Sequence, residues 1–198
     1  MKSRIPTAVV LFAALAVLLA GSAQAASTTY TDPAGDSLDR RASMDIVAVR
    51  YDVRRVDKAG PRSLVVEVKL AAPPEAQIGD YEVRAQVKGC GFVSARYSPG
   101  TALHPAIDSR TAWFQMACGS RGNVYGSTYI ARNAEFQIEG NTLRWSISLD
   151  ELPEQLRHGS TFRELRAFAK IPEGVVGPAF PVDPWVMDQA STDRTWSY

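Results

Sequence analysis

The sequence predicts an all-β protein, an antiparallel two-sheet β-sandwich of the jelly-roll or immunoglobulin-like kind. Three observations support this prediction. Short segments of alternating apolar and polar residues recur along the chain, turn residues separate them, and no long amphipathic helices alternate with them. A partly closed barrel would fit the same pattern and is the alternative.

The first three strands show a period of two, with apolar residues at every second position, in the segments 45–53, 64–70 and 81–88. Pro73 and Pro74 end the second of them, because proline has no N–H to donate to a β-ladder. Each strand is therefore expected to bury one face.

Four further strands are predicted at 92–97, 111–118, 134–138 and 143–149. The last two form a hairpin, because Gly140 and Asn141 supply the positive φ angles of a tight turn. Trp145 is in phase with the apolar residues of its strand and is expected in the core. Leucines at helical spacing, followed by Gly159, predict one short helix near 150–158, and 161–171 is the last long strand.

The N-terminus has the pattern of a secretory signal peptide. Lys2 and Arg4 precede an apolar run over 8–20, and the small residues of Ala23-Gln24-Ala25 predict cleavage before Ala26. We therefore expect a cleaved signal over 1–25, a single β-sandwich domain over 26–198, and a secreted or extracellular protein.

Charge and hydropathy limit the partners of the mature chain. Without Lys2 and Arg4, 20 basic residues stand against 21 acidic ones, a formal charge of −1, which gives no electrostatic attraction to nucleic acid. No later apolar run is long enough to cross a membrane, so we expect no membrane span in the mature chain. We also expect a monomer.

Cys90 and Cys118 are the two cysteines, and in an exported chain they are predicted to form one disulfide. Cys90 falls on the polar positions of its strand. Either a bulge at Gly89 or Gly91 changes the register, or the disulfide lies on the outer face.

An acidic tract, Asp32-Pro33-Ala34-Gly35-Asp36, opens the mature chain. Calcium takes carboxylate and carbonyl oxygens, and a turn set by proline and glycine would present both. The candidate metal ligands are Asp32, Asp36, Asp39, Asp45 and, if the C-terminal strand returns beside the first, Asp188. The alternative is that aspartate, proline and glycine only form turns here.

This tract, the following Asp45-Ile46-Val47-Ala48-Val49 and the strand Leu64-Val65-Val66-Glu67-Val68 resemble secreted bacterial β-sandwich domains of the DOMON and family-9 carbohydrate-binding-module type. The ending Trp185-Val186-Met187-Asp188-Gln189 with Thr195-Trp196-Ser197-Tyr198 is also similar. The resemblance implies calcium in the first acidic loop and a sugar or a cofactor on a sheet face or rim. The methionines and histidines do not match the haem-binding members, so haem is not expected.

A sugar-binding face would use flat aromatic rings beside amides and carboxylates. The candidate ligand-binding residues are Trp113, Gln115, Tyr97, Tyr125, Tyr129 and Trp185. Packing between the sheets is the alternative for each ring.

The sequence does not indicate an enzyme. Its Gly-Ser pairs lack the glycine-x-serine-x-glycine elbow, and paired carboxylates cannot be recognised from spacing alone. Two functions stay open: a non-catalytic binding domain for extracellular carbohydrate or an envelope component, and a structural or protein-interaction domain with no small ligand.

Overall fold

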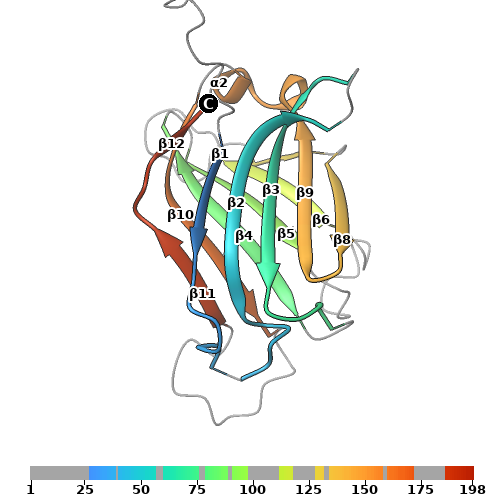
Figure 1. The fold of residues 1–198 in the computed structure, drawn as a ribbon. Coiled ribbons are helices and arrows are strands. Elements are labelled where there is room, and N and C mark those ends of the chain that lie inside the picture. Colours follow the sequence, from blue (N-terminus) through green and yellow to red (C-terminus); the bar gives the residue numbers. More distant parts are fainter. Residues whose placement is uncertain are drawn as a thin grey trace, which may run out of the picture.

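The computed structural model describes residues 27–38, 40–56, 60–75, 79–88, 91–97, 112–117, 128–131, 134–157, 160–171 and 186–198. Within these residues the chain forms two antiparallel β-sheets that pack face to face as a β-sandwich (Figure 1). The first sheet has five strands, in the spatial order β1 (Ser27–Thr31), β2 (Ile46–Arg55), β3 (Arg62–Leu70), β9 (Thr142–Ser148) and β8 (Glu135–Glu139).

The second sheet has seven strands. Six follow the spatial order β11 (Val186–Thr192), β10 (Thr161–Lys170), β4 (Asp80–Val87), β5 (Phe92–Tyr97), β6 (Ala112–Ala117) and β7 (Thr128–Ala131). The short β12 (Trp196–Ser197) also pairs with β10. Two short helices, η1 (Leu149–Glu151) and α2 (Glu154–Arg157), lie at the opposite end of the sandwich from the loop that joins β1 to β2 (Figure 1).

The predicted fold class is confirmed, and so are the eight predicted strands, to within a few residues at their ends. The hairpin of β8 and β9 turns at Gly140, whose φ is +60°. The helical segment is confirmed in two short pieces.

Strands β1, β7, β11 and β12 were not among the predicted strands. In β1 only Tyr30 is buried, so the strand has no apolar alternation to detect. In β11 the neighbours Met187 and Asp188 are both buried, which breaks the period of two.

Apolar side chains of both sheets meet between them and form one core. Trp145 is fully buried, as its phase in β9 predicts. Its ring packs against Phe136, and Phe136 stacks on Tyr97 with ring centroids 4.4 Å apart. These rings connect β8 and β9 of the first sheet to β5 of the second.

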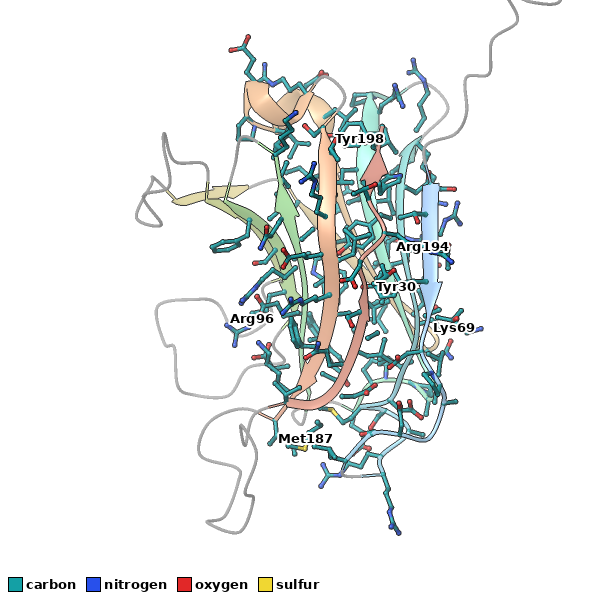
Figure 2. The ribbon with its side chains drawn as sticks, turned by 90° about the vertical axis from the view of Figure 1, so that its left-hand side faces the viewer. Tyr30, Lys69, Arg96, Met187, Arg194 and Tyr198 are labelled. Carbon is teal, nitrogen blue, oxygen red and sulfur yellow. The ribbon has the colours of Figure 1, made fainter. Side chains whose placement is uncertain are left out.

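The outer faces of the two sheets carry charged side chains and point away from each other. Figure 2 shows Arg96 of β5 on one side of the sandwich and Lys69 of β3 on the other, with Tyr30 between the sheets. Among the described residues, no helix has the length and apolar character needed to cross a membrane.

Candidate metal centre

The loop between β1 and β2 is attached to both sheets. Its Leu38 N–H donates to the Met187 carbonyl of β11 at 2.8 Å, and its Ser43 carbonyl accepts from the Tyr81 hydroxyl of β4 at 2.8 Å. The Asp45 carbonyl accepts from the Ala71 N–H, just beyond β3, at 2.9 Å. These bonds hold the loop across one edge of the sandwich.

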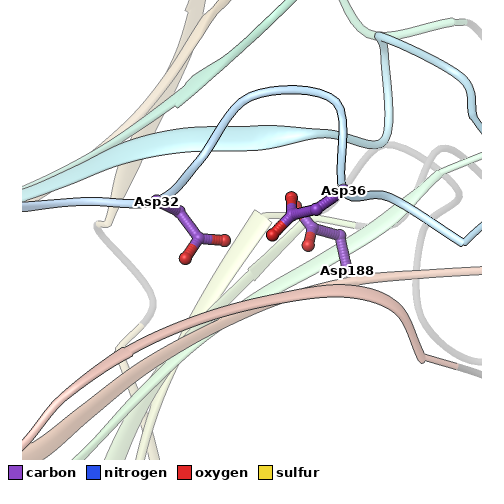
Figure 3. Close-up of side chains that lie close together, drawn as sticks. All are labelled: Asp32, Asp36 and Asp188. Atoms are coloured by element: carbon purple, nitrogen blue, oxygen red, sulfur yellow. The ribbon is translucent and has the colours of Figure 1, made fainter.

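Three carboxylates converge where this loop meets β11. Asp32 follows β1, Asp36 lies four residues further along the loop, and Asp188 projects from β11 (Figure 3). One carboxylate oxygen from each lies within 4.8 Å of the other two. Asp188 is buried, Asp32 is half-buried and Asp36 is exposed, so the cluster is open to solvent on one side.

A fourth carboxylate, Asp45, supports the turn that carries this cluster. Its Oδ2 accepts from the Gly35 N–H at 2.6 Å. Gly35 has φ +89°, a left-handed conformation that glycine adopts without strain. Asp45 is only 4% exposed, and its Oδ1 is buried with no hydrogen-bond partner. The buried Asp32 Oδ2 also lacks a partner.

Asp188 connects the start of the chain to its end. Its Oδ2 accepts from the Ile46 N–H at 2.5 Å, across 142 residues of sequence, and its Oδ1 accepts from the Gln189 N–H at 2.8 Å. Both oxygens therefore have one backbone donor each. A carboxylate oxygen can accept more than one bond, so both retain lone pairs for a further partner.

Burial and mutual repulsion disfavour the ionised form of the carboxylates in this cluster. Burial and the carboxylates of Asp188, Asp36 and Asp45 raise the pKa of Asp32 to about 6. Burial, with a smaller contribution from Asp36 and Asp45, raises the pKa of Asp188 against the lowering effect of its two N–H donors. Elsewhere in the described residues, the carboxylates of Asp52, Glu67, Asp80 and Glu82 have arginine or lysine partners.

The donor set suits calcium. Ca²⁺ takes six to eight oxygens at about 2.3–2.6 Å, so two ligands of one ion are at most about 5 Å apart. The three oxygens of Asp32, Asp36 and Asp188 meet this condition. The exposed side at Asp36 leaves room for water or turn carbonyls to complete the shell. Asp45 would contribute charge from behind the turn.

The sequence-predicted metal ligands are thus brought together in part. Asp32, Asp36 and Asp188 form the cluster, Asp45 supports it, and Asp39 lies outside the described residues.

Of the predicted ligand-binding residues, only Tyr97 has a described side chain. Tyr125 and Trp185 lie outside the described residues, as do Cys90 and Cys118 of the predicted disulfide. Three are described by backbone register alone: Trp113 pairs with Arg96, Gln115 with Ser94 and Tyr129 with Met116. Tyr97 is half-buried and stacks on Phe136 within the ring series of the core.

Sequence reasoning missed a second set of buried carboxylates, Asp80 and Glu82 on β4. The alternation of Glu82, Arg84 and Gln86 in β4 placed them on the outer face, where polar residues are usually exposed. Their burial depends on Arg96 and Lys170, which come from neighbouring strands. Only the strand order could reveal these partners.

Comparison of the chain with protein-family models, with curated proteins and with solved structures gave no match.

Proposed function

We propose that the protein is an exported, non-catalytic binding domain whose β-sandwich is closed at one edge by a structural calcium ion. The observation that carries the calcium site is the convergence of Asp32, Asp36 and Asp188 beside the buried, unpartnered oxygens of Asp45 and Asp32. An isolated buried carboxylate is costly unless it is paired or coordinates a metal. A divalent cation would supply the missing partner.

The position of the site supports a structural role. Its ligands come from the first loop and from β11, so a bound ion would join the first sheet to the edge of the second. Hydrogen bonds from Leu38 and Ile46 already cross the same seam. Calcium binding to the folded state alone would raise the free energy of unfolding.

Thermal unfolding with and without calcium tests the proposal. The mature chain, starting at Ala26, is melted in EGTA, in excess calcium and in excess magnesium. At calcium near one hundred times its Kd the stabilisation is about 2.7 kcal/mol, which corresponds to a rise in Tm of roughly 5–10 °C for a chain of this size. Magnesium should have a smaller effect, because it requires stricter octahedral geometry.

Two aspartate variants give the matched comparison. Asp188→Asn removes a ligand and should abolish most of the calcium-dependent shift. Asp52→Asn changes an equally buried aspartate, 3% exposed, that is paired with Arg50 on the outer face of the first sheet, and should keep the full shift. Equal Tm values in EGTA and in calcium for the unmodified chain would refute the site.

A further inference from the structure

The outer face of the second sheet presents cations to solvent. Four basic side chains project from three adjacent strands, β10, β4 and β5. We call them the cationic face: Arg84, Arg96, Arg166 and Lys170.

Two acidic side chains of this face, Glu82 and Asp80, lie beneath the cations. Glu82 Oε2 accepts from Lys170 Nζ at 2.5 Å, and Glu82 Oε1 accepts from Arg84 Nη2 at 2.7 Å. Asp80 accepts two bonds from the Arg96 guanidinium. The side chains of Glu82 and Asp80 are 7% and 6% exposed, against 48% for Arg84 and 35% for Arg96. At Arg84 and Arg96, a ligand that reaches this face therefore meets the cation before the carboxylate.

Two phenyl rings border Arg84. The centre of its guanidinium lies 5.5 Å from the ring centroid of Phe92 on β5 and 6.0 Å from that of Phe168 on β10. Lys170 Nζ lies 5.0 Å from the Phe168 ring. Both phenylalanines are half-buried, so each leaves part of its ring accessible between charged side chains. Cations and apolar surface thus alternate across three strands.

Two arginines of this face lie opposite each other on neighbouring strands. Arg84 and Arg166 are direct cross-strand partners in the register of β4 and β10. Like charges directly opposite each other destabilise a sheet. Arg166 has a carboxylate partner in Glu164 at 3.3 Å, but both side chains are nearly half exposed, where such a pair contributes little. An anion bound between the two arginines would remove this repulsion.

We propose that the cationic face binds an acidic polysaccharide, with Arg84 and Arg166 contacting a carboxylate of the polymer and the Phe92 and Phe168 rings contacting sugar C–H groups. Two features favour a sugar polymer over a nucleic acid. The cations are few and partly neutralised from below, which suits sparse negative charge, and the mature chain has a formal charge of −1. The proposal rests on the proposed role as a binding domain, but it does not require calcium.

Binding of hyaluronate to the purified mature chain tests the proposal, with dextran as the uncharged polymer and single-stranded DNA as the alternative polyanion. Affinity electrophoresis and calorimetry are run in both EGTA and calcium. We expect hyaluronate to bind in both buffers, more weakly as salt is raised, and dextran not to bind. Arg84→Gln should weaken binding about tenfold, the loss expected for one charge-assisted hydrogen bond.

Arg50→Gln is the matched control. Arg50 bonds Asp52 two residues away at 2.7 Å, as Arg84 bonds Glu82, but on the outer face of the first sheet. It should leave hyaluronate affinity within about twofold, because it is outside the proposed site. Absence of hyaluronate binding, binding of DNA alone, or an equal effect of the two variants would overturn the proposal. Hyaluronate binding without a calcium-dependent Tm would refute the calcium site and leave this one intact.

Discussion

Two groups of acidic side chains in this protein contain equally buried carboxylates that have different hydrogen-bond partners. On the outer face of the second sheet, Asp80 and Glu82 are 4% and 5% exposed, and arginine and lysine side chains bind them. In the loop cluster, Asp45 and Asp188 are 4% and 7% exposed, and their described hydrogen-bond partners are backbone N–H groups.

This difference bears on the proposed metal site. The carboxylates of the outer face carry charge that the chain itself compensates. In the loop cluster, neighbouring carboxylates raise the pKa of Asp32, so the negative charges oppose one another. Burial alone does not identify a metal centre, because the chain's own cations can compensate a buried carboxylate, as they do at Asp80 and Glu82.

The largest expected effect comes from removing an internal cation. Arg96→Met would leave the buried Asp80 without the guanidinium that binds it and should lower the free energy of unfolding by about 3 kcal/mol, because an unpaired buried charge is strongly destabilising. Urea denaturation measures the loss. Lys69→Met, an exposed change on the other outer face, should change stability by less than about 0.5 kcal/mol. A similar small change in both variants would show that Asp80 does not depend on Arg96.

In the loop cluster, removing a charged group should raise the free energy of unfolding rather than lower it. Asp32→Asn should raise the free energy of unfolding in EGTA by up to about 1 kcal/mol, because it relieves carboxylate repulsion that solvent partly screens. In excess calcium the same variant should be less stable than the unmodified chain, because a ligand is lost. Calorimetric melts in the two buffers measure both differences. A lower stability of Asp32→Asn in EGTA would contradict the claim that the carboxylates of the loop cluster repel one another.

The pH dependence should also separate the two groups. The pKa of Asp32 is about 6 in the folded chain and 3.8 in the unfolded chain. At a pH between these two values, the folded state therefore binds more protons than the unfolded state. The stability in EGTA should therefore rise, by up to about 1 kcal/mol, as pH falls from 7.5 to 5.

Glu67 and Glu82 behave in the opposite way. The pKa of each is lowered, by hydrogen bonds and charge from arginine and lysine that outweigh burial, so their contribution is lost only as pH falls below about 4.5. Calcium should remove the rise at mildly acidic pH, because the metal-bound carboxylates stay ionised. Urea midpoints at pH 7.5, 6 and 5 give the profile. A steady fall in EGTA over this range would contradict the assignment of Asp32.

The smallest expected effect concerns an exposed cation. Arg50→Gln should lower stability by less than about 0.5 kcal/mol, because Arg50 is 41% exposed and Asp52 keeps Arg54 at 3.5 Å. Urea denaturation beside Arg96→Met gives the contrast. A loss of stability as large as that of Arg96→Met would mean that solvent exposure of the arginine does not determine how much its ion pair contributes to stability.

Prediction from sequence succeeded where the signal was local. The alternation in β2, β3 and β4 identified strands and their buried faces, because side chains point to opposite faces at successive residues. It failed for β1, where only Tyr30 is buried, and for β11, where the buried Met187 is followed directly by the buried Asp188. The acidic tract was recognised because proline and glycine marked a turn beside aspartates.

The sequence by itself determined the fold class, most strands and the presence of carboxylates in the first loop, since these depend on patterns within a few residues. Only the tertiary structure decided which of those carboxylates meet. Asp188 reaches Ile46 across 142 residues, and Lys170 reaches Glu82 across 88, because strand order and register bring them together. The same strand order also gave Asp80 and Glu82 their cations, Arg96 and Lys170, since a cross-strand partner is set by topology and not by local pattern.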